Sequence, residues 1–597
     1  MNLSQDIITP HEAGTLPGLF KQRVNRSADK PAYRYYDSLN AVWMDISWRE
    51  MANEVTRWEQ ALHASGLHPG DRVAIMAKNS RLWVMFDQAA LSLGLVVVPV
   101  YAEDRADNVQ YILEHSGSKL LLVGGPPQWD RLRDKMKSCH VLKHIVAISD
   151  CGKSEDKRLK TLSDWLKKGI SAVTKPVLSP GDLATIVYTS GTTGAPKGVM
   201  LSHRNILANT YSCAQTGMAE RDGVFLSFLP LSHTFERTVG YYLPMMVDAV
   251  VAHSRSIADL PEDLLQVRPQ GIISVPRIFE RIYLKIRENL ATQSGMVQSM
   301  FDLAVQVGWR RFEYQQGRAS WHPSLLMWPA LEKMVAKKVL ARLGGRLRVA
   351  ISGGAALSPE IARVFIAFGV PLFQGYGLTE TSPVVSVNTR THNIPASIGL
   401  PLPDVQVRIG EQDELQVKAD SVMMGYWQNE QATRRTVDQN GWLHTGDKAR
   451  IKDGYIYITG RLKDIIVLAT GEKVPPADME LAICNDRLFE QVVIIGESRP
   501  FLSALVVVNS NEWNNFLQQH QLQAEPTDSD RLEQALLARM ALTLKDFPGY
   551  AQVYAVRYML EPWSVENDLL TPTLKVKRNK ILEIYRQQIE SMYQGHK

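Results

Sequence analysis

Apolar residues in the first half of the chain alternate between helical and strand spacing, and this alternation restricts the possible folds most strongly. Residues Trp48 to Ala64 have the period of an amphipathic helix, and Arg72 to Met76 form an apolar run typical of a buried strand. The alternation continues with a predicted helix over Leu82 to Leu93, a strand over Leu95 to Val100, a helix over Glu103 to Glu114 and a strand over Lys119 to Val123. Strands and helices that alternate in this way form parallel sheets covered by helices. We therefore expect an α/β fold of layered sheets and helices.

Chain length and a change of pattern near residue 460 predict two domains. A chain of 597 residues is too long for one hydrophobic core. After Gly460 the pattern becomes that of a compact α+β unit, with short strands over 464–468, 492–496 and 503–508 and helices over 476–483 and 530–547. We expect a large N-terminal domain over 1–460, a hinge over 461–463 and a smaller α+β C-terminal domain over 464–597.

A long helical pattern between Pro276 and Leu343 has two interpretations. It contains Trp309, Trp321 and Trp328 among many Leu, Met and Val residues. The simpler interpretation is a helical layer packed on a sheet, and we favour it. The alternative is that part of this apolar surface lines a channel for a long alkyl chain.

Composition excludes several classes of protein. A net charge of +5 is small for this length and does not indicate nucleic-acid binding, which requires basic residues concentrated on one face. The four cysteines, Cys139, Cys151, Cys213 and Cys484, have neither metal-site nor CxxC spacing, which fits a reducing compartment. No signal peptide or membrane-spanning stretch is predicted. We expect a cytoplasmic protein, and a peripheral contact with the inner face of a membrane stays open.

The densest chemical signal is the segment Tyr188-Thr-Ser-Gly-Thr-Thr-Gly-Ala-Pro-Lys-Gly198, which follows a strand-like run. Its glycines allow the backbone to approach a phosphate, its hydroxyl groups can donate hydrogen bonds, and Lys197 adds a positive charge. It is not a Walker A loop, because Pro196 stands where the second glycine should be. A surface turn would rarely combine all these features, so we expect a phosphate-binding loop.

Four further motifs follow in order along the chain. They are Gln374-Gly-Tyr-Gly-Leu-Thr-Glu380, Gly441-Trp-Leu-His-Thr-Gly-Asp447, Gly460-Arg-Leu-Lys-Asp464 and Leu570-Thr-Pro-Thr-Leu-Lys-Val-Lys-Arg578. Together with the loop, the ordered set closely resembles the signatures of the adenylate-forming superfamily. The last motif has Leu574 where the usual form has glycine, a variant that resembles the long-chain acyl-CoA synthetase branch.

The resemblance implies a nucleotide site and a catalytic lysine. It places ATP or AMP against Thr189, Ser190, Gly191, Thr192, Thr193, Gly194, Lys197, Gly354, Ala355, Gln374, Gly375, Tyr376, Gly377, Asp447 and Arg461. By resemblance, Tyr376 stacks on adenine, Thr379 bonds the α-phosphate, Glu380 holds Mg²⁺, Asp447 holds the ribose hydroxyls and Lys575 is catalytic. A structural alternative, a merely charged face, is accepted for Lys577 and Lys580 but not for Lys575.

The resemblance also implies an acyl site and a moving domain. Pro230-Leu-Ser-His-Thr-Phe-Glu-Arg237 would place His233 near the reacting carboxylate, although a single histidine is more often an ordinary polar residue. Gly353 and Gly375 would lie against the acyl group. The mobile C-terminal domain would rotate about Lys463, presenting Lys575 for adenylation and the loop around Gly471 for thioester formation.

The implied activity is that of an AMP-forming long-chain fatty acid–CoA ligase. ATP, Mg²⁺ and coenzyme A would be required, with the fatty acid as the other substrate. The sequence leaves two alternative functions: a ligase that delivers the acyl group to a carrier protein, and a nucleotide- or acyl-binding regulator without turnover. The sequence leaves the oligomeric state and the acyl chain length undetermined.

Overall fold

A computed structural model describes residues 6–167, 173–189, 195–462, 464–522, 529–571 and 575–594. In the part described, one sheet of nine strands has the order β16-β15-β14-β13-β12-β10-β11-β1-β2. Its strands are β1 (Pro31–Asp37), β2 (Val42–Ser47), β10 (Val224–Ser227), β11 (Val250–His253), β12 (Gly271–Ser274), β13 (Val349–Ser352), β14 (Leu372–Gly377), β15 (Val384–Val387) and β16 (Leu400–Pro401). The central strands are parallel, and β2, β15 and β16 add antiparallel pairs at the edges.

A second sheet, of eight described strands, has the order β19-β9-β8-β4-β3-β5-β6-β7. Its strands are β3 (Arg72–Met76), β4 (Val96–Pro99), β5 (Ser118–Val123), β6 (His144–Ala147), β7 (Leu159–Thr161), β8 (Leu183–Thr189), β9 (Lys197–Ser202) and β19 (Gly425–Tyr426). Along β3, Val73 and Ile75 join one apolar cluster whereas Ala74 and Met76 join another. Side chains of a strand alternate between faces, so both faces of this sheet are buried, as parallel sheets require.

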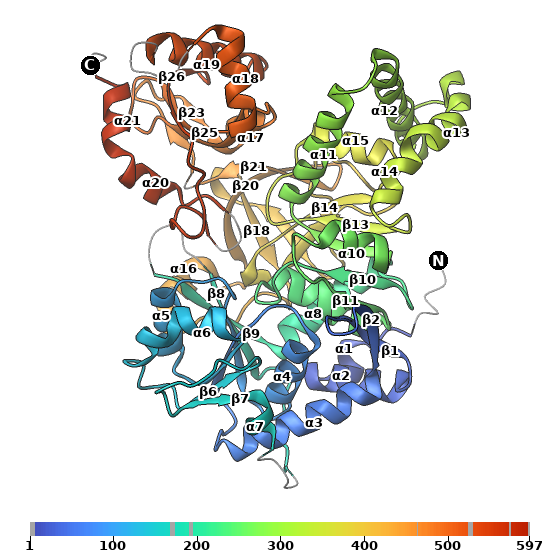
Figure 1. The fold of residues 1–597 in the computed structure, drawn as a ribbon, viewed down its shortest axis with the longest axis vertical. Coiled ribbons are helices and arrows are strands. Elements are labelled where there is room, and N and C mark those ends of the chain that lie inside the picture. The colour runs from blue at the N-terminus through green and yellow to red at the C-terminus, as the bar shows by residue number, and fades with distance from the viewer. Residues whose placement is uncertain are drawn as a thin grey trace.

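Helices fill the space between the two sheets and cover their outer faces (Figure 1). The shared cluster contains α2 (Leu16–Ser27), α3 (Trp48–Ala64), α4 (Arg81–Ser92), α8 (His203–Gln215), the π-helix η1 (Glu236–Tyr242) and α9 (Leu243–Val247). The outer layers include α5 (Ala106–Ser116) and α6 (Pro126–Met136) on the eight-stranded sheet, and α10 (Leu260–Val267) and α15 (Pro359–Ala367) on the nine-stranded sheet. The predicted α/β fold of layered sheets and helices is confirmed.

Local sequence explains why the early predictions were accurate. Helix α3 and strand β3 have the predicted bounds, and α4, α5, β4 and β5 lie within a few residues of theirs. Ser47 and Glu50 form a capping box at the start of α3, which satisfies backbone N–H groups that the helix itself cannot pair. The strong amphipathic pattern then keeps Trp58 and Leu62 in the core.

A four-stranded antiparallel sheet was not predicted and connects the two parts of the chain. Its order is β17-β18-β20-β21, with bounds β17 (Gln406–Ile409), β18 (Glu414–Lys418), β20 (Leu443–Lys452) and β21 (Tyr455–Arg461). The last strand, β21, ends at Arg461, in the segment predicted to be the hinge. Lys463 itself lies outside the described residues.

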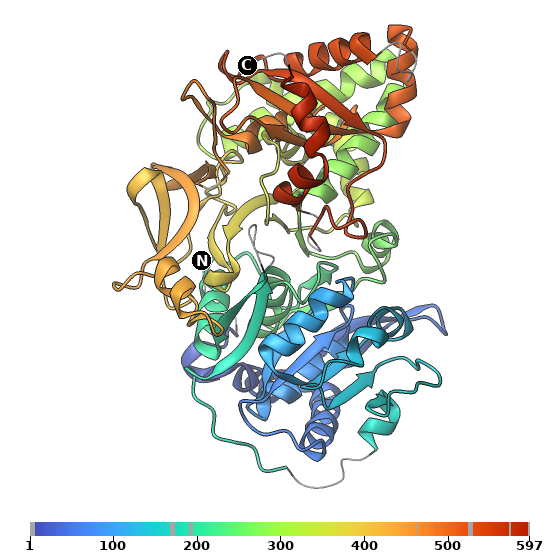
Figure 2. The same ribbon diagram turned by 90° about the vertical axis from the view of Figure 1, so that its left-hand side faces the viewer.

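The C-terminal part has its own apolar core, which is the property expected of a separate domain. It contains the pair β22 (Ile466–Val467) and β23 (Lys473–Val474), and the three-stranded sheet β24 (Phe489–Ile495), β25 (Leu502–Val508) and β26 (Val553–Met559). Helices α17 (Pro476–Cys484), α18 (Ser510–His520), α19 (Ser529–Thr543), α20 (Arg578–Ile584) and α21 (Arg586–Met592) surround these strands. Figures 1 and 2 place this part at the opposite end of the molecule from the eight-stranded sheet.

The long helical pattern predicted between residues 276 and 343 is an arm of helices that extends from the body in Figure 1. It consists of α11 (Pro276–Ala291), α12 (Gly295–Gln315), the 3₁₀-helix η2 (Pro323–Met327), α13 (Trp328–Leu331), the π-helix η3 (Glu332–Ala336) and α14 (Lys337–Arg342). The predicted helical layer is present, but Trp328 and Leu331 of the arm pack with Phe368, just after α15, so this side of the arm packs on helices and not on a sheet.

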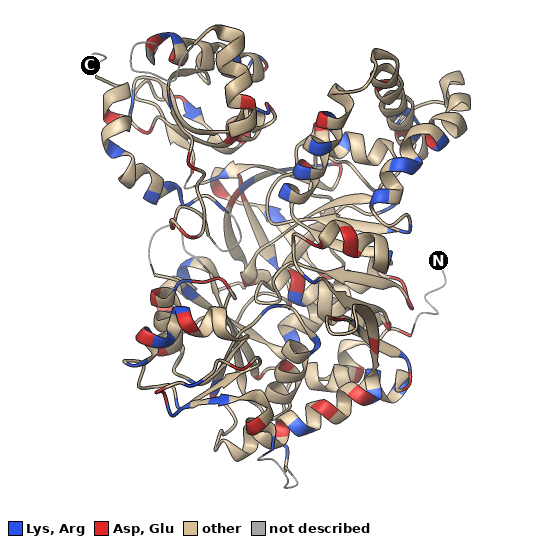
Figure 3. Ribbon diagram, viewed as in Figure 1, with Lys and Arg blue, Asp and Glu red and all other residues tan. Residues whose placement is uncertain are grey.

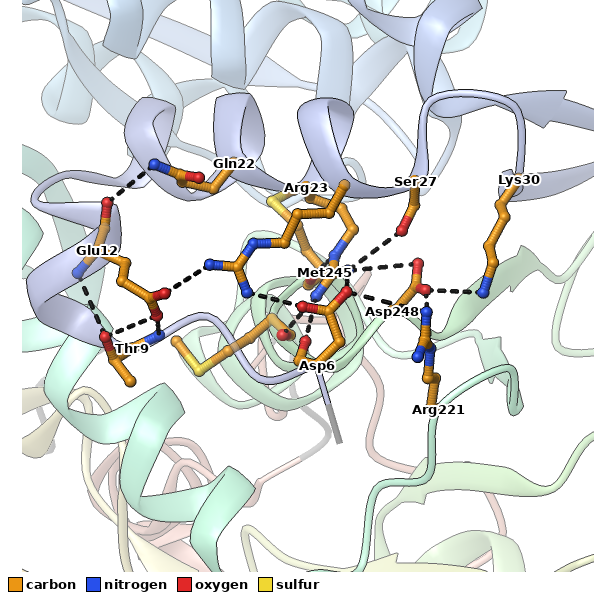
Figure 4. Close-up of polar contacts among 12 residues, drawn as sticks. Asp6, Thr9, Glu12, Gln22, Arg23, Ser27, Lys30, Arg221, Met245 and Asp248 are labelled. Atoms are coloured by element: carbon orange, nitrogen blue, oxygen red, sulfur yellow. Dashed lines mark hydrogen bonds and ion pairs between the residues drawn. The ribbon is translucent and has the colours of Figure 1, made fainter. Parts of the chain in front are cut away.

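Buried Arg23 fastens the N-terminal helices to the middle layer (Figure 4). Its guanidinium donates to the carbonyl oxygens of Met245 and Met246, both at 2.8 Å, and to Oδ2 of Asp6 at 3.0 Å. These carbonyls are at the end of α9, where a helix leaves its last acceptors unpaired. The contact holds α9, and with it the adjoining η1, in a fixed place. Among the described residues, no helix is long and apolar enough to cross a membrane.

Candidate active site

The motifs found in the sequence converge on one large cleft, a cavity of about 1760 Å³ between the N-terminal part and the C-terminal domain. Thirteen predicted site residues line it: Thr189, Lys197, His233, Gly353, Gly354, Gly375, Tyr376, Gly377, Thr379, Glu380, Asp447, Arg461 and Lys575. They come from both large sheets, from the four-stranded sheet and from the C-terminal domain. Parallel strands place such residues together because their carboxyl ends share one edge of the sheet.

Tyr376, Asp447 and Arg461 form one connected group, with Tyr376 near the end of β14, Asp447 within β20 and Arg461 at the end of β21. The Tyr376 hydroxyl donates to Oδ2 of Asp447 at 2.5 Å, and Nε of Arg461 donates to Oδ1 of the same carboxylate at 2.9 Å. Burial and the neighbouring Asp447 charge raise the pKa of Tyr376 well above its ordinary value. The ring stays neutral and flat, and it offers an aromatic face beside a carboxylate, which suits a base and its attached ribose.

Glu380, Tyr426 and Lys197 form a second group. The Tyr426 hydroxyl donates to Oε1 of Glu380 at 2.8 Å, and Nζ of Lys197 lies 5.0 Å from the centre of the Tyr426 ring. Tyr426 was missed by the sequence analysis. Its signal would have been the aromatic pair of Gly425-Tyr-Trp427, which no motif on its own explains. Strand pairing of β19 with β9 brings this tyrosine beside the phosphate-loop hairpin.

Lys575 reaches the cleft from the C-terminal domain. Its backbone N–H donates to Oγ1 of Thr571 at 3.0 Å, and its backbone oxygen accepts from the Thr571 N–H at 2.8 Å. The side chain is open to solvent in the cleft, but surrounding protein partly desolvates the ammonium, and this lowers the pKa of Lys575. The positive charge of Arg461 lowers that pKa further, while Asp447 opposes the shift.

His233 lies close enough to Lys575 for their charges to interact. Burial, with a smaller contribution from Lys575, lowers the pKa of His233 to about 4, so the imidazole is neutral near pH 7. Its Nδ1 accepts a 3.2 Å hydrogen bond from the Phe235 N–H. The proton of the neutral ring is therefore on Nε2, where it can be donated to a bound carboxylate.

The segment that carries His233 is held from both sides. Oδ1 of Asn79 accepts from the Leu231 N–H at 2.9 Å, and the Asn79 amide donates to the Leu229 oxygen at 2.6 Å. Four residues after the histidine, buried Arg237 pairs with buried Asp87 of α4 and donates to Thr185 of β8. These contacts link the segment to the eight-stranded sheet, so a ligand at His233 meets a rigid wall.

Buried apolar side chains line one part of the cleft, which we call the apolar branch. Its walls come from the middle helices and from the nine-stranded sheet, and they comprise Cys213, Met218, Ala219, Phe225, Phe235, Val239, Leu243, Val349, Ile351, Val384 and Val387. No arm residue between 276 and 342 lines the cleft in the part of the chain that is described. The cleft therefore lends no support to the alternative interpretation of the arm as an alkyl channel.

Glycines are needed at two points of the wall. A Cβ on Gly377 would lie 2.1 Å from the Pro383 oxygen, which leaves no room for any side chain. A Cβ on Gly353 would lie 3.0 Å from Cζ of Phe235, so this glycine lets the aromatic ring close against β13. Gly353 thus stands between Phe235 and the sheet, at the junction of the polar cleft and the apolar branch.

Some predicted site residues are not brought to the cleft wall. Gln374 is buried, and its side chain accepts from the Leu357 N–H at 3.1 Å and donates to the Pro395 oxygen. Ala355 is exposed beside Gly354, and Gly471 lies in the exposed turn between β22 and β23. The predictions for Ser190, Gly191, Thr192, Thr193, Gly194 and Lys463 fall outside the described residues.

The residues of the cleft fit magnesium only together with a nucleotide. The described residues contain no cluster of three or more His, Cys, Asp or Glu side chains able to enclose a metal ion. Glu380 offers a single carboxylate, one oxygen of which already accepts from Tyr426. Mg²⁺ commonly binds through one or two carboxylates plus substrate phosphates and water, and Glu380 fits that arrangement.

Comparisons with known proteins agree with this geometry. Residues 20–427 match the family model for AMP-binding enzymes, and residues 463–597 match the model for the AMP-binding enzyme C-terminal domain. The chain is 30% identical over 580 residues to the long-chain-fatty-acid–CoA ligase FadD15 of Mycobacterium bovis, covering 95% of each chain. It is 27% identical to the chloroplastic long-chain-fatty-acid–[acyl-carrier-protein] ligase AEE15 of Arabidopsis thaliana, covering 97% of this chain and 86% of the relative.

Solved structures share the fold. ATP-bound MatB from Rhodopseudomonas palustris superposes with a TM-score of 0.70 at 21% identity, covering 96% of this chain and 99% of that one. The anthranilate CoA ligase AuaEII in complex with anthranoyl-AMP superposes with a TM-score of 0.72 at 18% identity, covering 96% and 98%. The two matched family models together cover most of the chain, and the shared fold covers nearly all of it. The protein therefore belongs to the AMP-binding enzyme family and has the adenylate-forming fold.

Proposed function

We propose that the protein activates a long-chain fatty acid with ATP and transfers the acyl group to coenzyme A. One observation carries the proposal: Lys575 of the C-terminal domain lies in the cleft with Asp447 and Arg461 and within charge-interaction range of His233. The cleft thus brings together a cation, Lys575, a neutral hydrogen-bond donor, His233, and a carboxylate suited to ribose hydroxyls, Asp447. This is the set of groups that adenylate formation needs.

In the proposed first half-reaction, an oxygen of the fatty acid attacks the α-phosphorus of ATP and pyrophosphate leaves. His233 donates from Nε2 to the carboxylate and fixes its orientation. Lys575 and the Thr379 hydroxyl stabilise negative charge that develops around the α-phosphate, and Lys197 faces the leaving phosphates. Positioning and charge stabilisation of this kind account for most of the rate of phosphoryl-type transfers. Mg²⁺ held at Glu380 would neutralise phosphate charge.

In the proposed second half-reaction, the thiolate of coenzyme A attacks the acyl carbonyl and AMP leaves. The Gly471 turn is exposed and away from the cleft, while Lys575 is inside it. This arrangement supports the assignment of the present orientation to adenylate formation. We assign the rotation to the hinge over 461–463, with 464–597 as the moving domain, so that the Gly471 turn replaces Lys575 for thioester formation.

The apolar branch supports a fatty acid as substrate. Its walls are buried Met, Phe, Val, Leu and Ile side chains and contain no charged group, as an alkyl chain requires. The helical arm does not contribute to the argument for a fatty acid, because none of its described residues lines the cleft. Support from the relatives is independent of the geometry, since several carry long-chain substrates in their names.

A carrier-protein ligase is the second candidate, because the relative AEE15 is named for delivery to acyl-carrier protein. Both candidates share the first half-reaction and differ only in the acceptor. ATP–pyrophosphate exchange with octanoate, laurate, palmitate and oleate tests the shared step. Addition of coenzyme A or of purified acyl-carrier protein then identifies the acceptor.

The expected result is exchange that depends on the acid and is strongest with palmitate or oleate, followed by acyl-CoA formation. Exchange strongest with octanoate would contradict the long-chain assignment. Acylation of carrier protein but not of coenzyme A would show that the carrier protein is the acceptor. A folded protein without exchange would contradict the enzymatic proposal. The Lys575→Ala variant is the matched control for contaminating activity.

A further inference from the structure

One face of the helical arm combines exposed apolar side chains with lysines and lies outside the cleft. It is carried by the continuous helical segment η2–α13–η3–α14, residues 323–342. We call it the arm face and define it by Leu326, Met327, Ala330, Lys333, Met334, Lys337 and Lys338. Leu326 is 75% exposed, Met327 45% and Met334 43%, although these side chains are usually buried.

The exposure follows a helical period, so the arm face is a true face of the segment. Trp328, Leu331, Val335 and Ala336 are buried and pack with α12 and α15. The residues of the arm face project on the opposite side, three or four positions apart. The segment therefore has two apolar sides, one packed on the protein and one open to solvent. Exposed Trp321, which precedes the segment, adds an amphipathic ring.

The charge along the arm is mainly positive. From Tyr314 to Pro359 the sequence has seven Lys and Arg residues and a single acidic residue, Glu332. The whole arm, 276–342, contains eleven basic and five acidic residues. Its net charge is therefore +6, compared with +5 for the entire chain. In Figure 3 blue segments outnumber red ones along the arm. Within the part of the structure described, Lys333, Lys337 and Lys338 form no ion pair.

We propose that the arm face binds the surface of an anionic lipid bilayer. An apolar stripe between lysines matches an interface in which acyl chains lie beneath negative headgroups. Lysine stems can lie along the apolar boundary while their ammonium groups stay among the headgroups, and tryptophan favours the same depth. A second copy of the chain fits less well, because two identical faces would bring six lysines together without a carboxylate to pair them.

The inference does not depend on the proposed reaction, and binding can be measured without substrate. The full chain is floated with vesicles of phosphatidylcholine alone and of phosphatidylcholine with about one third phosphatidylglycerol. We expect flotation with the anionic vesicles, little with the neutral ones, and release at high salt. Each lysine near an anionic surface contributes a factor of about five to partitioning.

Two variants separate charge from apolar contact. The triple substitution Lys333→Gln, Lys337→Gln and Lys338→Gln should weaken binding to anionic vesicles by roughly 100-fold. The double substitution Leu326→Ser and Met334→Ser should weaken it at every salt concentration. A matched control, Lys153→Gln, Lys157→Gln and Lys167→Gln, removes the same charge from exposed positions elsewhere and should bind like the parent protein.

Far-ultraviolet circular dichroism and the thermal unfolding midpoint check that each variant is folded. The inference is overturned if the parent protein does not float, or if both arm variants float as well as the control. It is also overturned if the arm substitutions leave flotation unchanged but abolish a dimer seen by sedimentation, since a second copy would then occupy the face.

Discussion

The hydroxyl of Tyr426 donates a 2.8 Å hydrogen bond to Oε1 of Glu380, and the same ring lies under the ammonium of Lys197. Tyr426 therefore joins the carboxylate proposed for Mg²⁺ to the hairpin of the phosphate loop. Burial and the Glu380 charge raise the pKa of Tyr426, so the hydroxyl keeps its proton and stays a donor. The hydroxyl therefore contacts the Glu380 carboxylate, while the ring face of the same side chain contacts Lys197.

Removal of this hydroxyl should weaken magnesium binding. Tyr426→Phe keeps the ring under Lys197 but leaves Glu380 without its donor, so the carboxylate loses its fixed orientation. Outer hydrogen-bond partners of metal ligands commonly contribute about tenfold to metal affinity. We expect the Mg²⁺ concentration for half-maximal ATP–pyrophosphate exchange to rise about tenfold, with a smaller change in the KM for the acid. Tyr554→Phe, at an exposed position, is the control. An unchanged Mg²⁺ dependence would contradict the role.

Lys575 should make adenylation sensitive to alkaline pH. Its pKa is lowered by desolvation and by Arg461, against the opposing charge of Asp447, while nearby His233 is neutral. A lysine with a lowered pKa loses its charge at a lower pH than an ordinary lysine, so kcat/KM for adenylation should fall on the alkaline side below pH 10.5. Lys575→Arg stays charged and should move this fall to higher pH.

Lys575→Ala separates the two half-reactions. Loss of one charge-stabilising group commonly costs ~10² to 10³ in rate. We expect that loss in exchange, with near-normal transfer to coenzyme A from ready-made acyl adenylate. Equal losses in both steps would mean that Lys575 supports the fold or both reactions.

Sequence alone was sufficient for elements whose pattern and caps agree. Helix α3 has both a capping box and a strong apolar stripe, and its bounds were predicted to the residue. The strand predicted over 464–468 is only Ile466–Val467, because it pairs with the two-residue β23 alone. The antiparallel sheet of β17, β18, β20 and β21 was missed because β17 is largely exposed and gives no apolar pattern.

The candidate site was predictable where a motif carries its residues and not where distant segments meet. Asp447 and Arg461 were found in separate motifs, and the pairing of β20 with β21 places them side by side. Tyr426 is 46 residues from Glu380, and their contact follows from the pairing of β19 with β9. No local pattern encodes that pairing. For the same reason the apolar branch, built from six elements, could not be read from any one segment.

Gly353→Leu should shorten the acyl site. A Cβ at this position already lies 3.0 Å from the Phe235 ring, so a leucine must push the ring or itself into the apolar branch. We expect kcat/KM for palmitate to fall much more than that for octanoate. Acids of graded length in an exchange assay measure this directly. A uniform loss at every length would show that the substitution distorts β13 instead of narrowing the branch.

An ion pair between the domains should favour the adenylating orientation. Nη1 of Arg105, at the start of α5, lies 2.7 Å from Oδ2 of Asp568 in the C-terminal domain. Asp568 also pairs with Lys577 and Lys580, so loss of Arg105 leaves it paired within its own domain. Arg105→Gln should therefore loosen the docking of the domain without unfolding it.

Because Arg105 is partly exposed, the pair is worth at most about 1 kcal/mol, which corresponds to roughly a two- to fivefold shift between orientations. We expect adenylation to slow by that factor in rapid-quench measurements, while acyl transfer from ready-made adenylate is unchanged or faster. Lys135→Gln is the matched control, since it breaks the 2.6 Å pair with Asp107 inside the N-terminal domain and removes the same charge. If both variants slow adenylation equally, the effect comes from charge near α5 and not from domain docking. If Arg105→Gln slows transfer as much as adenylation, the ion pair has no preference for either orientation.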